Sequence, residues 1–150
     1  MTTTGKIELM APAGNFESLQ AALDNGADSI YFGVEQLNMR ARASINFTLD
    51  DLQEISERCK AKNVRTYLTL NTIIYDHDLT IVKTLLQKAK DADITAVIAM
   101  DQAVIASARA IGMEVHISTQ INITNIETAK FYAIFADTMV LSRELSLRQV

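Results

Sequence analysis

Residues 64–72 read Val-Arg-Thr-Tyr-Leu-Thr-Leu-Asn-Thr, a short run rich in apolar residues that ends in two polar ones. The same pattern recurs along the chain just before each expected helix. Its other instances are Ile7 to Met10 before Ala11-Pro12-Ala13-Gly14-Asn15, Asp28 to Phe32 before Gly33, and Glu114 to Ile117 before Ser118-Thr119-Gln120. Such strand-to-helix transitions predict a functional site, because α/β proteins place ligands and chemistry at the carboxyl ends of parallel strands.

The length of 150 residues suits one domain with a sizeable core, and 49% hydrophobic and 21% charged residues are typical of globular proteins. A net charge of -4 argues against an overall electrostatic footprint for nucleic acid or anionic membrane, although a local basic patch stays compatible with it. The single cysteine, Cys59, excludes an internal disulfide and indicates a reducing compartment. No secretory signal or membrane-spanning segment is found, so we expect a cytoplasmic protein without a membrane partner.

Apolar periodicity predicts helices that alternate with strands. The strands are expected at residues 7–10, 30–32, 64–70, 96–100, 114–117 and 138–141. The helices are expected at residues 16–25, 49–62, 79–89, 102–111 and 126–135. Gly26 supplies a left-handed exit from the first helix, Thr48 caps the second, and Asn63 ends it.

This strict alternation predicts an α/β fold with a parallel sheet and right-handed crossovers. Since nothing indicates a reversal of strand order, we expect parallel (β/α) repeats that form the first six strands of a TIM-type barrel, a partial barrel. Ser146 resembles the N-cap of a sixth helix. That helix would have a single turn, which is too short to offset the free-energy cost of helix nucleation. Residues 1–150 are therefore expected to be the N-terminal portion of a longer chain, inactive alone and associating through open sheet edges.

Several blocks of sequence occur in order along nearly the whole chain. They are Glu8 to Asn15, Gly26 to Gly33, Asn38 to Ala43 with Asn46-Phe47, Tyr67 to Thr72, His116 to Asn122 with Thr124-Asn125, and Leu141 to Leu145. Together they resemble the start of the collagenase-like peptidase family, peptidase family U32. The resemblance implies a TIM-type barrel and a hydrolase acting on peptides, while other family members take part in hydroxylating tRNA or rRNA bases or in oxygen-independent hydroxylation during ubiquinone synthesis.

The resemblance also bears on cofactors. Several family members resemble iron–sulfur proteins, with four cysteines downstream of the region seen here, which makes an iron–sulfur cluster a candidate cofactor of a full-length parent. This chain departs from that pattern, because its one cysteine lies on the apolar stripe of an expected helix and is interpreted as a small buried hydrophobe. No cofactor is therefore expected in residues 1–150 themselves.

His116 is the first candidate for catalysis, because it shares a strand face with Glu114 and Ser118. In a barrel mouth, an imidazole beside Ser118 and Gln120 could transfer protons near neutral pH. The alternative is a core histidine satisfied by a neighbouring hydroxyl. The chain has no Gly-x-Ser-x-Gly elbow, so the pattern is not a serine-protease signature. The candidate catalytic residues are His116, Ser118, Gln120 and Glu144.

Substrate contact is expected from a long connection and from the other strand ends. Residues 33–48 carry Arg40 and Arg42, which with Asn38 and Asn46 could bind a carboxylate or phosphate. A solvated loop could carry the same arginines, and Arg143 with Glu144 could instead form an ion pair at the rim. The candidate substrate-binding residues are Arg40, Arg42, Asn71, Asn122, Asn125 and Arg143.

Two further motifs favour structural roles, so we expect no metal site. Pro12 to Asn15 could present backbone N–H groups to an anion, but a tight turn is the better interpretation. Asp76-His77-Asp78 precedes a helix, where acidic residues serve as caps more often than as metal ligands. Three functional hypotheses remain: a peptidase acting on peptides, an RNA-modifying or redox hydroxylation protein, and a binding domain with an open, flavodoxin-like sheet.

Overall fold

A computed structural model describes residues 7–34 and 47–150. The strands are β1 (Met10–Pro12), β2 (Ser29–Phe32), β3 (Arg65–Leu70), β4 (Ala96–Ala99), β5 (Glu114–Ile117) and β6 (Thr138–Met139). The α-helices are α1 (Phe16–Asp24), α2 (Leu52–Ala61), α3 (Leu79–Asp91), α4 (Gln102–Ala110) and α5 (Ile126–Tyr132). Short 3-10 turns, η1 (Leu49–Asp51), η2 (Asp76–Asp78) and η3 (Thr119–Ile121), precede α2 and α3 and follow β5.

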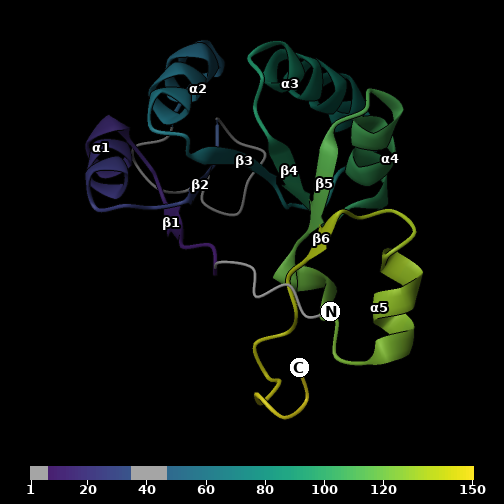
Figure 1. Ribbon diagram of the computed structural model, residues 1–150. Helices are drawn as coiled ribbons and strands as arrows, with labels where there is room; N and C mark the ends of the chain where they lie inside the picture. The colour runs from purple at the N-terminus through teal and green to yellow at the C-terminus, as the bar shows by residue number, and fades with distance from the viewer. Residues whose placement is uncertain (1–6, 35–46) are drawn as a thin grey trace.

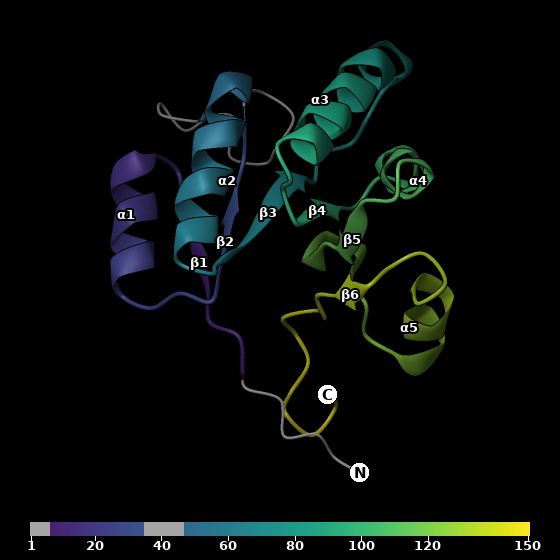
Figure 2. The same cartoon turned by 45° about the horizontal axis from the view of Figure 1, so that its top comes forward.

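The strands form one parallel sheet in the order β1-β2-β3-β4-β5-β6. The helices lie on the outer side of the curled row of strands, so the sheet forms part of a barrel wall (Figures 1 and 2). The predicted sequential order is confirmed, and the flavodoxin-like alternative is wrong because β1 does not lie between β2 and β3. No helix in the described ranges is both long and apolar enough to cross a membrane.

The two faces of the sheet have different chemistry. Side chains that face the helices form the main apolar core, in which Ile30, Leu68, Val97 and Val115 are fully buried. The opposite face, which we call the inner wall, carries Tyr31, Tyr67, Ala96 and Ile98 in a separate small cluster. Strand side chains alternate between faces, so polar residues at the remaining inner positions point away from the helices.

Several predicted boundaries are confirmed by backbone geometry. Gly26 and Asn63 adopt φ angles of 80° and 56°, the left-handed conformation expected where α1 and α2 end. Thr48 and Asp51 form a capping box at the start of η1. Asn15 caps α1, its side chain accepting from the Ser18 N–H at 2.8 Å, which supports the tight-turn interpretation of Pro12 to Asn15.

Several boundaries need correction. α5 ends at Tyr132 rather than at residue 135, and β6 ends at Met139 rather than at residue 141. The first strand begins at Met10 rather than Ile7, because the carbonyl of Leu9 accepts bonds from the N–H groups of Asp28 and Ser29 where the two strands first meet. The expected helix at Ser146 is only a turn, in which the Ser146 hydroxyl and N–H both donate to the Gln149 side chain.

Cys59 lies on the face of α2 that packs into the core, and its burial raises the pKa of the thiol from 9.0 to about 11. The thiolate fraction at neutral pH should fall about 100-fold, so we predict that the native protein reacts with Ellman's reagent at least that much more slowly than the unfolded chain. A matched control is Ala61→Cys in a Cys59→Ala background, which places an exposed thiol on the same helix. Equal rates for native Cys59 and the exposed thiol would contradict the buried placement.

Candidate functional site

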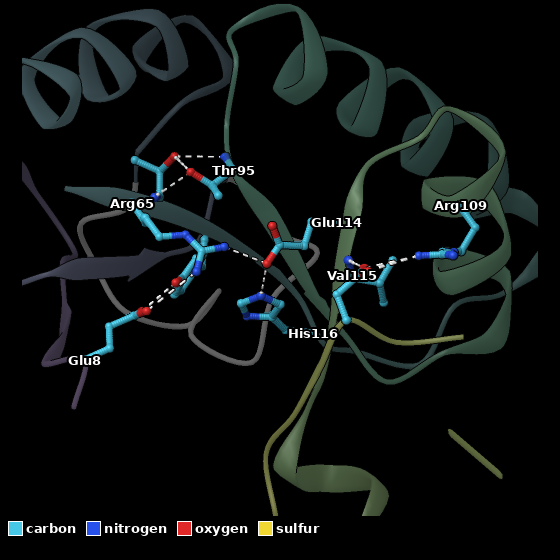
Figure 3. A network of polar contacts seen from close by, with 10 residues as sticks. Glu8, Arg65, Thr95, Arg109, Glu114, Val115 and His116 are labelled. Carbon is cyan, nitrogen blue, oxygen red and sulfur yellow. Dashed lines mark hydrogen bonds and ion pairs between the residues drawn. The ribbon is translucent and has the colours of Figure 1, made fainter. Parts of the chain in front are cut away.

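Five residues on or next to the inner wall form a continuous set of polar contacts, the inner-wall network: Glu8, Arg65, Tyr67, Glu114 and His116. Figure 3 labels four of them, Glu8, Arg65, Glu114 and His116. The Arg65 guanidinium donates to Glu114 Oε1 at 2.6 Å and lies 3.6 Å from Glu8 Oε2. The Tyr67 hydroxyl donates to Glu8 Oε1 at 2.5 Å. Arg65 and Glu114 are the first residues of β3 and β5, so the network lies toward the amino ends of the strands.

His116 is almost fully buried, with 5% of its surface exposed, and lies between two members of this network. Its Nε2 is 2.8 Å from Glu114 Oε1, and its ring centroid is 4.6 Å from that of Tyr67. An ionised carboxylate only accepts hydrogen bonds, so Glu114 fixes Nε2 as the donor. The Tyr67 ring is also covered by Arg65, whose Cζ is 5.2 Å from the ring centroid.

Burial and hydrogen bonding shift the pKa values of two members of the network, Glu8 and Tyr67. Partial burial favours a higher pKa for Glu8, but the hydroxyl groups of Ser29 and Tyr67 and the charge of Arg65 outweigh it, so the pKa is lowered. Burial and the bond to Glu8 raise the pKa of Tyr67 to about 12, so the phenol stays protonated. The network therefore contains two carboxylates around one arginine, with His116 in contact with the second carboxylate.

The expected meeting of His116 and Ser118 at the barrel mouth is not found. His116 turns back toward the start of β5, where Glu114 binds it, whereas Ser118 lies beyond the end of the strand. His116 forms its hydrogen bond with the Glu114 carboxylate. The alternative of a core histidine expected this bond to be made with a neighbouring hydroxyl. Its catalytic role stays a prediction, but this geometry does not pair it with Ser118.

Polar residues do meet at the carboxyl ends of β5 and β6. The buried Ser118 hydroxyl donates to Gln120 Oε1 at 3.2 Å. The Ser142 hydroxyl donates to the Glu144 carboxylate, and this bond lowers the pKa of Glu144. Two bonds join these loops: Thr119 Oγ1 to the Leu141 carbonyl at 3.4 Å, and the Ser142 N–H to the Ile123 carbonyl at 3.0 Å. We call Ser118, Gln120, Ser142 and Glu144 the rim cluster.

The remaining candidates divide into three groups. Asn71 is half-buried directly after β3, at the same edge of the sheet as the rim cluster. Asn122 and Arg143 are exposed near this edge, Asn122 with a left-handed φ of 55°. Asn125 is a helix cap, because its side chain accepts from the Thr128 N–H at 2.9 Å, and its expected role in substrate binding stays a prediction. Arg40, Arg42, Asn38 and Asn46 lie outside the described residues.

The acidic residues before α3 act as the capping interpretation predicts. Asp78 Oδ2 accepts from the Tyr75 N–H at 3.0 Å, which secures the start of η2. Within residues 7–34 and 47–150, no group of three or more His, Cys, Asp or Glu side chains could hold a metal ion.

Comparison with known proteins places this geometry in a family. The model described as "Peptidase family U32" matches residues 14–150. The chain belongs to this family. It is 53% identical over 143 residues to a protein of Porphyromonas gingivalis named collagenase, covering 95% of this chain and 34% of that relative. It is 32% identical over 150 residues to tRNA hydroxylation protein P1 of Bacillus subtilis, covering 98% of this chain and 35% of that relative. The U32 chain thus spans about a third of the length of these curated relatives.

Solved structures agree on the fold. The structure of the U32 peptidase Mk0906 superposes with a TM-score of 0.72 at 13% identity, covering 94% of this chain and 61% of that chain. A deoxyribose phosphate aldolase from Aeropyrum pernix gives a TM-score of 0.67 at 15% identity, covering 89% and 63%. At these identities the likeness concerns the barrel architecture alone.

Sequence reasoning missed most of the inner-wall network. Only Glu114 was linked to His116, through their shared strand face. A signal for Arg65 and Tyr67 was present, because positions 65 and 67 alternate with apolar core residues and so must face away from the helices. Glu8 precedes β1 and carries no periodic signal, since its contacts come from β3.

We predict that Arg65→Met destabilises the protein by about 1 kcal/mol at pH 7, because Arg65 holds two carboxylates but is partly screened by solvent. Folding lowers the pKa of Glu8, so Glu8 contributes to the stability of the folded state. This contribution is present above the unfolded pKa near 4.5 and is lost as pH falls through the lower folded pKa. The difference in the free energy of unfolding between Arg65→Met and the wild type should therefore become smaller below about pH 4. Urea unfolding at several pH values, with the exposed Arg148→Met as control, measures this. A loss that does not change with pH would contradict the network.

Proposed function

We propose that this chain forms part of the barrel of a peptidase that binds an extended peptide across the carboxyl ends of the strands. The observation that carries the proposal is the 53% identity with the relative named collagenase. The relatives named for tRNA or rRNA hydroxylation are 30% to 34% identical over similar lengths of this chain.

The rim cluster supports distinct roles for its members. The bond with Ser142 lowers the pKa of Glu144, which makes it a weaker base but keeps this exposed carboxylate ionised at neutral pH. It can accept a proton from an attacking water and pass that proton to the leaving amine nitrogen. The Ser118 hydroxyl is engaged with Gln120 rather than with an imidazole, so among residues 7–34 and 47–150 no general base contacts it to activate it as a nucleophile. We therefore assign Glu144 as the general base, and Gln120, which the buried Ser118 hydroxyl orients, as a group that hydrogen-bonds the peptide backbone.

The inner-wall network has a different proposed role. Its members lie toward the amino ends of the strands, the side of a barrel where side chains serve stability more than chemistry. The contact of His116 with both Glu114 and Tyr67 fixes the middle of β5, which leads directly into Ser118. We assign His116 as a positioning residue that sets the direction of the β5 end.

RNA or redox hydroxylation is the second candidate, favoured by the relatives named for tRNA and rRNA hydroxylation. An iron–sulfur cluster, the cofactor that the family resemblance suggested, does not fit the described residues. Cys59 is buried on the core-facing side of α2, and its raised pKa keeps the thiol protonated. In the described ranges, no group of three or more His, Cys, Asp or Glu side chains could bind a metal ion.

The test uses a full-length protein that contains this chain, assayed on a fluorogenic peptide and on denatured collagen. Glu144→Gln should lower kcat/KM by about 100-fold or more, since general-base catalysis contributes on this scale. Glu127→Gln on α5, which removes another exposed carboxylate, should leave kcat/KM unchanged.

Two results would contradict the peptidase proposal. One is hydrolysis by wild type that Glu144→Gln does not reduce. The other is absence of hydrolysis together with loss of a hydroxylated nucleoside, detected by mass spectrometry of cellular RNA, when the gene is deleted. The second result would favour RNA hydroxylation.

A further inference from the structure

The connection between β3 and η2 has no helix or strand of its own, and its shape comes from contacts with other parts of the fold. Residues 71–75 directly follow β3 at the edge of the sheet where the rim cluster lies, and the first of them is Asn71, a candidate for substrate binding. Ile74 packs against the main core, while Ile73 and Tyr75 on either side of it are each 62% exposed. This segment, which we call the β3 loop, is thus anchored to the fold at position 74.

Thr72 shows that this shape is not the one that local contacts of the β3 loop favour. Its Oγ1 atom is buried and has no hydrogen-bond partner in the described part of the chain. A buried hydroxyl without a partner disfavours the conformation that buries it. Such a cost persists only where surrounding contacts hold the backbone in place, and it occurs often at functional sites. The contacts that hold the β3 loop therefore bear on its role.

Asp101 makes the hydrogen bond that ties the β3 loop to the end of the neighbouring strand. It follows β4, which pairs with β3 in the sheet, and it is the N-cap of α4. Its Oδ1 accepts from the Ala103 N–H at 2.8 Å, and its Oδ2 accepts from the Ile74 N–H at 3.1 Å. One carboxylate thus caps the helix and holds the loop.

Helix capping alone does not explain why this position uses both oxygens of a carboxylate. A helix N-terminus needs one side-chain acceptor, which Ser or Asn supplies about as well as Asp. In this chain Asn15 and Asn125 cap α1 and α5 in that way. A carboxylate differs because each of its oxygens accepts hydrogen bonds and neither donates when it is ionised. At Asp101 the second oxygen is the one that binds the β3 loop.

We propose that Asp101 is a positioning residue, which holds the β3 loop in the shape that presents Asn71 to the substrate. The inference rests on the proposed peptidase function, because Asn71 belongs to the candidate substrate-binding residues of that site. Asp101 itself needs no contact with the substrate. A loop that is held before binding lowers the entropic cost of binding. Loss of the contact should therefore weaken substrate binding more than it slows the chemical step.

Asp101→Ser in a full-length protein separates the two roles of the carboxylate, since one hydroxyl can cap α4 but cannot also bind Ile74. Hydrogen–deuterium exchange should become at least about tenfold faster at the Ile74 N–H and stay unchanged at the Ala103 N–H. With the fluorogenic peptide, KM should rise about tenfold while kcat changes less than about twofold. Asp101→Asn is a second variant of the same size, because its amide oxygen can accept from only one of these two N–H groups.

The matched control is Asp91→Ser at the far end of α3, which removes an exposed carboxylate away from the β3 loop and should leave KM and the exchange at Ile74 unchanged. If Asp101 were only a helix cap, Asp101→Ser would keep the wild-type KM, and this result would overturn the inference. Unchanged exchange at Ile74, or a fall in kcat without a rise in KM, would also overturn it. A wild type that hydrolyses no peptide would contradict the peptidase proposal, whereas the hold of Asp101 on the loop would still stand or fall with the exchange rate at Ile74.

Discussion

The parallel pairing of six short strands is the constraint on which the rest of the structure depends. Pairing in register forces alternate side chains to opposite faces, so each strand must supply apolar residues to the helices and a different set to the inner wall. It also brings all carboxyl ends to one edge. Asn71 and the rim cluster, which are far apart in sequence, lie at that edge because the strands before them are parallel.

The same constraint separates two kinds of polar chemistry along the strands. Toward the amino ends, Arg65 bridges Glu8 and Glu114, and these contacts join β3 and β5 to the segment before β1. At the carboxyl ends, Ser118 and Glu144 lie on loops that hydrogen bonds tie together, yet the Glu144 side chain stays exposed. The first arrangement satisfies charges within the wall, while the second leaves groups available to a substrate.

Much of this could be predicted from the sequence, because local patterns determine element type and ends. Apolar periodicity located the α-helices and strands of residues 7–34 and 47–150, and Gly26 and Asn63 marked helix ends through their left-handed backbone. Strand alternation placed His116 on the correct face but could not give its rotamer, which Glu114 and Tyr67 determine. The cap role of Asn125 was open to prediction, since Asn before an expected helix favours capping. The place of Glu8 was not, because its partners are distant in sequence.

The most direct test of the account is hydrogen–deuterium exchange of a full-length protein with and without a non-hydrolysable peptide containing Gly-Pro-Pro repeats. The account predicts added protection in residues 71–78, 118–122 and 142–145, with no change at residues 8–9 and 63–66. Protection centred on the amino ends of β3 and β5 would contradict it, because the substrate would then bind on the side assigned to the inner-wall network.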